Sequence, residues 1–101
     1  MNDEHVVLNV HMEAAPGRET DLEHVLRSLV APTRKEPGCL VYRLHRDPQH
    51  AGKFMFYERF ASQAALDAHL ASPHFQAFLK FRAAPDPVAA MNVTTWREIE
   101  P

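Results

Sequence analysis

The central stretch of the chain, residues 39–60, reads CLVYRLHRDPQHAGKFMFYERF and decides the fold. It holds two segments, Cys39–Asp47 and residues 53–60, in which apolar and polar residues alternate. A period of two is typical of a strand with one buried face. The polar turn between them, residues 48–52, is short, so the two strands are predicted to form an antiparallel hairpin.

Helical spacing flanks the hairpin on both sides. In residues 18–30 the apolar side chains recur every three or four positions, which predicts an amphipathic helix that Pro32 ends or kinks. After the hairpin, Ser62 is a typical N-cap for a second helix. The pair Ser72-Pro73 restarts that helix, because serine caps well and proline suits the first helical position.

Two more alternating segments, residues 6–13 and 89–99, lie outside the helices. The order is therefore β-α-β-β-α-β. This order predicts a ferredoxin-like α+β fold, an antiparallel sheet with the helices on one face. At 101 residues and 11.5 kDa, residues 1–101 are expected to form a single domain.

The alternation predicts two different sheet faces. The more apolar face, expected to meet the helices, comprises Val6, Leu8, Val10, Leu40, Tyr42, Leu44, Phe54, Phe56 and Phe60. The other face mixes apolar, aromatic and polar residues, namely Val7, Asn9, His11, Val41, Arg43, Met55, Tyr57, Thr94 and Trp96. Such a mixture is typical of protein–protein interfaces. We therefore expect a homodimer that forms through this sheet face.

Composition and charge exclude several classes of function. Hydrophobic residues make up 46% and charged residues 24% of the chain, the balance of a globular protein. No apolar run approaches the roughly 20 residues of a membrane span, and no basic, apolar leader is visible, so a cytoplasmic location without membrane association is expected. A net charge of -2 argues against nucleic acid as a partner.

The motifs for bound cofactors are also missing. The seven histidines show no recognised metal-ligand spacing, and His69 and His74 are five residues apart across a helix break. The three glycines are isolated, so no phosphate-binding loop is expected. Cys39 is the only cysteine and is interpreted as a small buried residue. The sequence therefore predicts neither a metal site nor a cofactor.

Two titratable residues remain as candidates for chemistry. Glu58 shares the inner face with the phenylalanines of its strand, and a carboxylate there is costly unless it is paired or reaches solvent. His69 follows the apolar Leu66 by three residues, so its ring is expected to face inward too. Phe75 and Phe78 would line the same region. An aromatic pocket with a carboxylate and an imidazole is typical of a small-molecule site, although core packing explains the phenylalanines equally well.

Three runs of sequence carry a resemblance to a known family. They are Glu36-Pro-Gly-Cys-Leu-Val-Tyr42, Phe54-Met-Phe-Tyr-Glu58-Arg-Phe60 and Ala65-Leu-Asp-Ala-His69-Leu-Ala-Ser-Pro-His74-Phe75. Together they resemble the antibiotic biosynthesis monooxygenase superfamily. The resemblance implies a dimeric α+β barrel with a cavity between sheet and helices. Its recurring site positions fall on Tyr42, Glu58, Phe60, His69, His74 and Phe75.

The resemblance does not extend to every branch of the family. The haem-degrading members carry Asn, Trp and His where this chain has Val10, His69 and Leu79, so haem binding is not expected. The tryptophan and asparagine of the polycyclic-aromatic oxygenases would fall near Phe60 and Phe56, and both polar groups are missing here.

We therefore expect a cofactor-independent monooxygenase that oxidises a small electron-rich, quinol-type aromatic with O2. In this hypothesis His69 is the general base, and Glu58 is its orienting partner or a proton acceptor. The substrate-binding residues are Tyr42, Phe56, Phe60, His74, Phe75 and Phe78. Two alternatives stay open, a non-catalytic dimer that binds a small molecule and an isomerase of a phosphorylated compound. The isomerase would need a basic phosphate site, for which the candidates are Arg43, Arg46, Lys53 and Arg59.

Overall fold

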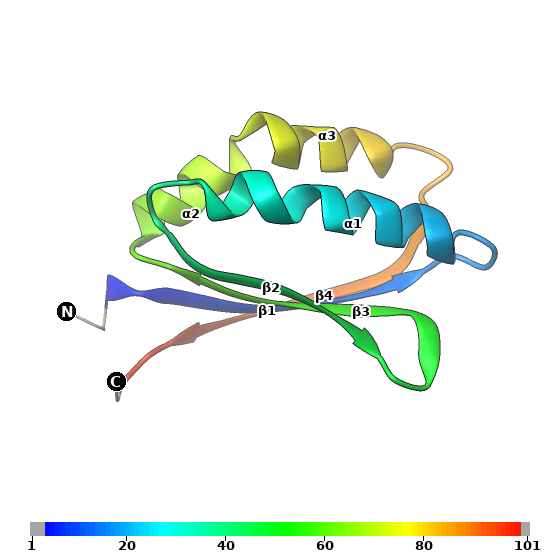
Figure 1. Cartoon of the computed structure of the whole chain (residues 1–101), viewed down its shortest axis with the longest axis horizontal. Helices are drawn as coiled ribbons and strands as arrows, with labels where there is room; N and C mark the ends of the chain where they lie inside the picture. The colour runs from blue at the N-terminus through cyan, green and yellow to red at the C-terminus, as the bar shows by residue number, and fades with distance from the viewer. Residues whose placement is uncertain (1–3, 100–101) are drawn as a thin grey trace.

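A computed structural model describes residues 4–99 of the chain. The elements follow in the order β1 (Val6–Ala14), α1 (Glu19–Arg34), β2 (Cys39–Asp47), β3 (His50–Phe60), α2 (Gln63–Leu70), α3 (Pro73–Phe81) and β4 (Val88–Arg97). The strands form one antiparallel sheet in the order β2-β3-β1-β4, and the helices lie over one of its faces (Figure 1). The ferredoxin-like α+β fold predicted from the sequence is confirmed.

Alternate positions of the strands build the core between sheet and helices. From β1 the core takes Leu8, Val10 and Met12, and the register places Phe56 of β3 opposite Val10. One stripe of α1, formed by Leu22, Leu26 and Leu29, covers these side chains and is almost completely buried. Each fully buried aliphatic or aromatic side chain contributes roughly 1.5–3 kcal/mol. The apolar stripe of the helix and the apolar face of the strands therefore pack against each other in one core.

The inner face differs from the expected one at Leu40. The pairing of β2 with β3 shifts between Cys39 and Val41, so Leu40 is an extra residue in the ladder. Because a β-bulge breaks the strict alternation, the side chain of Cys39 packs against the core and Leu40 is 47% exposed. The expectation that Leu40 meets the helices is wrong for this reason.

One predicted boundary also differs, in the hairpin, and the structure defines where the first helix ends. The first helix continues through Pro32 to Arg34. The N–H that proline lacks would have bonded the carbonyl of Ser28, an exposed residue, so solvent can replace that bond. In the hairpin, β3 begins at His50 because His50 pairs with Asp47, which leaves a two-residue turn.

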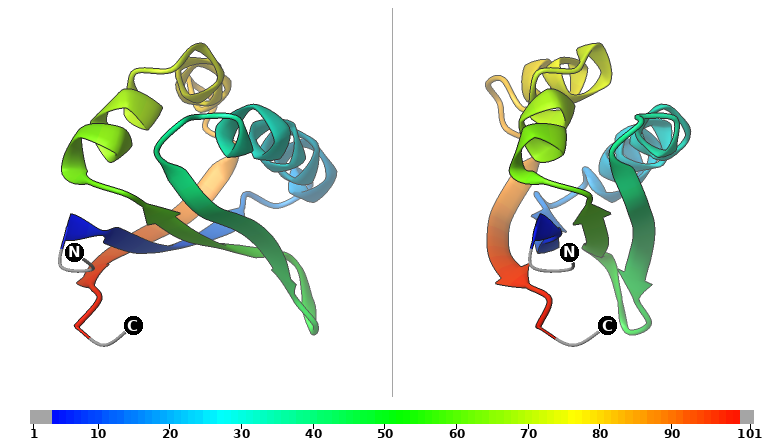
Figure 2. Two further views of the ribbon diagram at one scale, coloured as in Figure 1. Left: turned by 60° about the vertical axis from the view of Figure 1, so that its left-hand side comes forward. Right: turned by 90° about the vertical axis from the view of Figure 1, so that its left-hand side faces the viewer.

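The second helical segment is divided into two helices, as predicted. Ser62 caps α2 by accepting a hydrogen bond from the backbone N–H of Ala65 at 3.1 Å. Ser72 caps α3 in the same way, and Pro73 occupies its first turn. The chain changes direction between the two helices, so that α3 runs beside α1 while α2 lies over the end of the sheet (Figure 2).

Residues 4–99 leave the sheet face opposite the helices uncovered (Figure 1). Trp96 stands on this open face with 58% exposure, and its indole N–H donates to the hydroxyl of Thr94 at 3.0 Å. Beside Trp96, Val7 is buried between its cross-strand neighbours. The open face therefore combines a large exposed aromatic residue with apolar and polar neighbours.

Candidate functional site

His69 lies in the last turn of α2 and points into the layer between the helices and the sheet. Only 2% of the residue is exposed, and Leu66, one turn earlier, is buried as well. This is the inward orientation that the three-residue spacing predicted. Four rings surround the imidazole, with centroid distances of 5.2 Å to Phe60, 5.2 Å to Phe75, 5.6 Å to Tyr42 and 5.9 Å to His74.

A carboxylate approaches His69 from the loop between α1 and β2. Oε2 of Glu36 lies 3.0 Å from Nδ1 of His69 and 2.5 Å from Nε2 of His74. Because an ionised carboxylate only accepts hydrogen bonds, both ring nitrogens carry a proton when they bond to it. The side chains of Glu36 and His74 are 17% and 19% exposed, so these three residues, the Glu–His–His cluster, connect the interior with the surface.

Local backbone contacts hold this cluster in place. The hydroxyl of Ser72 donates to the carbonyl of His69 at 2.6 Å while it caps α3, which fixes the turn between the two histidines. On the other side of the cluster, Gly38 packs against α2. A Cβ atom at Gly38 would stand only 2.3 Å from Cβ of Ala65. The loop that carries Glu36 can therefore approach α2 this closely only with glycine at position 38.

The convergence of His69 and His74 differs from what their spacing indicated. A separation of five residues does not put two side chains on one face of a single helix. However, α2 ends at Leu70 and α3 begins at Pro73 in another direction (Figure 2), so the two imidazoles come from different helices and meet at one carboxylate. The spacing therefore shows no chelate within one helix, as the sequence indicated, but the helix break allows the two imidazoles to converge.

Glu58 and Tyr42 are cross-strand neighbours on the inner face of the sheet. They are 5% and 3% exposed. Burial, together with the negative charge of Glu36, raises the pKa of Glu58 from 4.5 to about 8. Burial and the charge of Glu58 raise the pKa of Tyr42 well above its usual range. Near neutral pH both groups therefore hold a proton.

The structure brings most of the predicted site residues together, but in a different pairing. Phe56 stacks on Tyr42 with a centroid distance of 4.5 Å, and Phe78 contacts Phe75 at 5.8 Å, which extends the shell of rings around His69. The carboxylate bonded to His69 is Glu36, in place of the expected Glu58.

Sequence reasoning missed Glu36 because it lies in a loop, where no periodicity indicates where a side chain points. Its one signal was its place at the start of the run Glu36–Tyr42 that carries the family resemblance. The reason that Glu36 reaches His69 is the close approach of its loop to α2 at Gly38.

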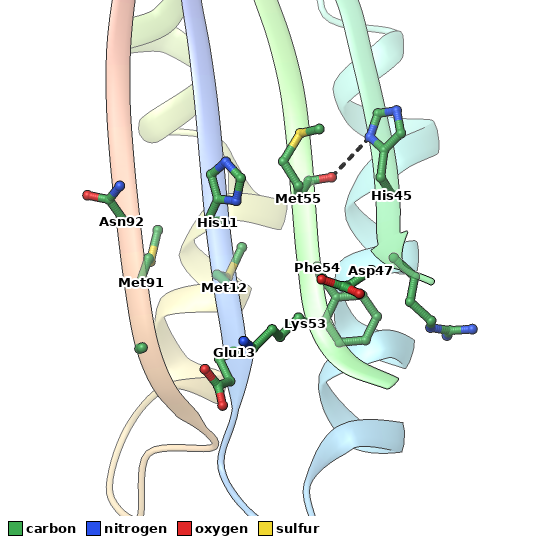
Figure 3. Close-up of a pocket in the computed structure, with 12 residues that line it drawn as sticks. His11, Met12, Glu13, His45, Asp47, Lys53, Phe54, Met55, Met91 and Asn92 are labelled. Carbon is green, nitrogen blue, oxygen red and sulfur yellow. Dashed lines mark hydrogen bonds between the residues drawn. The ribbon is translucent and has the colours of Figure 1, made fainter. Parts of the chain in front are cut away.

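Three surface hollows lie elsewhere in the described part of the chain. The first, about 460 Å³, crosses the open face, where His11, His45, Met55 and Asn92 stand side by side on the four strands (Figure 3). The second, about 480 Å³, lies between α1 and β2, and the third, about 600 Å³, follows β2. Neither Glu58 nor His69 lines any of the three. Aromatic side chains line the immediate surroundings of His69.

Comparison with known proteins places this architecture in a family. Residues 5–80 match the family model for antibiotic biosynthesis monooxygenases. The chain belongs to the antibiotic biosynthesis monooxygenase family. Among solved structures, PA3566 from Pseudomonas aeruginosa is 32% identical, with a TM-score of 0.91 over 99% of both chains. A crystal structure of an antibiotic biosynthesis monooxygenase is 28% identical, with a TM-score of 0.84 over 94% of this chain and 99% of that one.

Two curated proteins are similar in sequence. Rv0793 of Mycobacterium tuberculosis, whose name provisionally calls it a monooxygenase, is 37% identical over 68 residues, which are 67% of this chain and 63% of that protein. The uncharacterised protein sll1783 of Synechocystis is 29% identical over 78 residues, 77% of this chain and 53% of that protein. The chain thus spans between about half and two thirds of the curated relatives that it matches.

The description monooxygenase belongs to the family model, to Rv0793 and to one of these solved structures. No helix in residues 4–99 has the length and apolar character needed to cross a membrane.

Proposed function

We propose that this protein is a cofactor-independent monooxygenase that oxidises a small electron-rich aromatic substrate of the quinol type with O2. The observation that carries the proposal is the buried imidazole of His69, bonded to Glu36 at 3.0 Å inside a shell of aromatic rings. With its Nδ1–H donating to Glu36, the ring has Nε2 free as a base. A base in such apolar surroundings suits removal of a phenolic proton, because the product imidazolium is stabilised by the carboxylate.

The reaction balances without a bound redox group, because the substrate supplies the electrons. One benzenediol reacts with one O2 to give one hydroxyquinone and one water, and the two hydrogen atoms lost from the diol are those of the water. The quinol loses four electrons and O2 gains four, and one oxygen atom enters the ring while the other leaves as water. Deprotonation of the quinol makes the first electron transfer to O2 easier, which is the step that His69 assists. The resulting radical pair joins through a C–O bond to a peroxide that then loses water.

Glu58 takes a different part in this proposal from the one expected from sequence, whereas Tyr42 keeps its expected part in binding the substrate. With a pKa of about 8, Glu58 is a proton donor near neutral pH, suited to the peroxide oxygen that leaves as water. Tyr42, whose ring lies 5.6 Å from that of His69, would donate a hydrogen bond to a substrate oxygen. Phe56, Phe60, Phe75 and Phe78 would form the apolar wall, and His74, the more exposed histidine, the entrance.

The isomerase alternative is less well supported by the charges of the described residues. Among its candidate phosphate ligands, Arg46 forms an ion pair with Glu23, and Arg59 forms one with Glu98. Arg59 also belongs to the open face of the sheet, whereas Glu58 lies on the inner face. Neither Arg46 nor Arg59 is therefore an unpaired cation beside the Glu–His–His cluster.

We also propose that the protein acts as a homodimer formed through the open face of the sheet. The large exposed side chain of Trp96 supports this, because exposed aromatic residues are enriched at protein interfaces.

The test is oxygen consumption on a panel of quinols, without added flavin or metal, with product analysis under ¹⁸O2. The wild type is expected to transfer one labelled atom to the product. His69→Gln keeps a polar side chain of similar length but removes the base, and a loss of at least about 100-fold in kcat/KM is expected, the usual contribution of a general base.

His24→Gln serves as the matched control, since His24 is an exposed histidine of α1, and it should retain full activity. If the protein binds quinols but consumes no oxygen, the result contradicts the proposed enzyme and supports the non-catalytic binding dimer. Full turnover in a folded His69→Gln variant would contradict the assignment of the base.

A further inference from the structure

We propose that the Glu–His–His cluster is also a binding site for one divalent first-row transition-metal ion. Glu36, His69 and His74 each offer one ligand atom, and the three atoms lie within 4.8 Å of one another. In residues 4–99 no other three histidine, cysteine, aspartate or glutamate side chains meet this condition. Metal binding goes beyond the proposed oxidation and does not rest on it.

The donor set selects the class of ion. Two imidazole nitrogens and one carboxylate oxygen are the protein ligands of several zinc enzymes and of non-haem Fe(II) sites, where the remaining positions hold water or substrate. Hard ions such as Mg²⁺ and Ca²⁺ prefer sites made of oxygen atoms alone. A borderline ion such as Zn²⁺, Co²⁺ or Fe²⁺ therefore fits best.

The distances from Glu36 to the two ring nitrogens are close to those in a metal site, and the two nitrogens lie within 4.8 Å of each other. With metal–ligand bonds of about 2.0–2.1 Å, neighbouring ligand atoms stand about 2.9 Å apart in an octahedral site and about 3.3 Å apart in a tetrahedral one. The separation of 3.0 Å between Glu36 and His69 already matches, and the separation of 2.5 Å between Glu36 and His74 must widen. His74 is the most exposed of the three side chains and can make this movement.

Contacts of the surrounding backbone already hold the three ligand residues in position. Ser72 fixes the turn between the two histidines through its hydrogen bond to His69 and its cap of α3. Gly38 holds the loop of Glu36 against α2. Binding would therefore cost little ordering of the chain, and the partly exposed side leaves room for water as a further ligand.

Another pair of histidine and carboxylate shows why this cluster is distinctive. His5 lies 3.6 Å from Glu98, but Arg59 forms an ion pair with the same carboxylate. A guanidinium at that position neutralises the carboxylate and repels a cation. In the described part of the chain, no arginine or lysine bonds to the carboxylate of Glu36. The hydrogen-bond partners of this carboxylate are the imidazoles of His69 and His74.

Metal binding and base catalysis would exclude each other at this site. An ion bound to Nδ1 of His69 and to Glu36 withdraws the carboxylate that stabilises the imidazolium. The metal-bound protein is then an inhibited form, so the site would make any quinol oxidation sensitive to transition metals.

The experiment is a titration of the full chain, first treated with a chelator, with Co²⁺ as the probe. Visible d–d absorption reports coordination, and competition by Zn²⁺ reports displacement. We expect saturation at one Co²⁺ per chain. Glu36→Gln and His74→Gln are expected to raise the dissociation constant at least about tenfold, since even loss of a residue that only supports a ligand costs about 10–100-fold.

His24→Gln and His50→Gln remove exposed histidines outside the cluster and should leave the titration unchanged. Circular dichroism shows whether each variant is folded. Absence of a one-to-one Co²⁺ spectrum, or binding that persists unchanged in folded Glu36→Gln and His74→Gln, overturns the metal site. The oxidation assay without metal is separate, so either proposal can fail while the other stands.

Discussion

The carboxyl group of Glu58 is buried, and burial disfavours its ionised form. Its pKa is raised from 4.5 to about 8, by burial first and by the charge of Glu36 second. Between these two values the folded protein holds a proton that the unfolded chain has released. Stability therefore falls as pH rises through this window, and the penalty is fully developed above about pH 8.

Glu58→Gln should remove most of this pH dependence, because a neutral amide of similar shape does not ionise. The free energy of unfolding, measured with urea at pH 5, 7 and 9, should fall less in the variant than in the wild type. The difference in that fall should be on the order of a few kcal/mol. Glu13→Gln, at an exposed glutamate of β1, should keep the wild-type fall. Identical pH profiles for Glu58→Gln and wild type would show that Glu58 ionises freely in the folded protein.

Among the elements, the contact between the α1–β2 loop and α2 decides whether the Glu–His–His cluster forms. Gly38→Ala would place a methyl group 2.3 Å from Cβ of Ala65, so the loop and the helix must separate. We expect a loss of roughly 1–3 kcal/mol in the free energy of unfolding, as is usual for overpacking. We also expect weaker Co²⁺ binding, because Glu36 moves with the loop.

A double variant provides the control for Gly38→Ala. Gly38→Ala combined with Ala65→Gly removes the clash and should recover the Co²⁺ affinity, although glycine inside α2 costs about 1 kcal/mol in stability. Gly17→Ala tests a glycine with a φ of 80°, where an added Cβ would meet no atom within 4 Å, so it should cost stability without altering the cluster. A Gly38→Ala variant with wild-type stability and Co²⁺ affinity would contradict this view.

The sequence predicted the elements that have a regular period of apolar residues. Alternation in Cys39–Asp47 and the stripe of α1 identified strand and helix, because one buried face per element was enough to orient them. Leu40 escaped prediction because a bulge adds one residue and reverses the alternation locally. The role of Glu36 was not predicted because a loop has no period that indicates where a side chain points. The contact of His69 and His74 with one carboxylate was not predicted because it depends on the angle between two helices.

At the scale of the whole molecule, the uncovered sheet face is expected to determine association. The proposed homodimer should elute at twice the monomer mass of 11.5 kDa in size-exclusion chromatography with light scattering. Trp96→Lys places a charge in the proposed contact and should shift the population toward monomer. Leu70→Lys changes an exposed apolar residue on α2, on the helix side, and should leave the mass unchanged. A wild type that stays monomeric at high concentration would rule out the dimer.

The bulge at Leu40 has a further consequence for how copies of this chain meet. β2 is an edge strand, and a straight edge offers a row of free amide and carbonyl groups on which another strand can add. The irregular register at residues 39–41 and the nearby charges of Arg43 and Arg46 interrupt that row. Sheet extension from chain to chain, the first step toward fibrils, is thereby discouraged along this border, while the broad surface beneath stays free for orderly pairing.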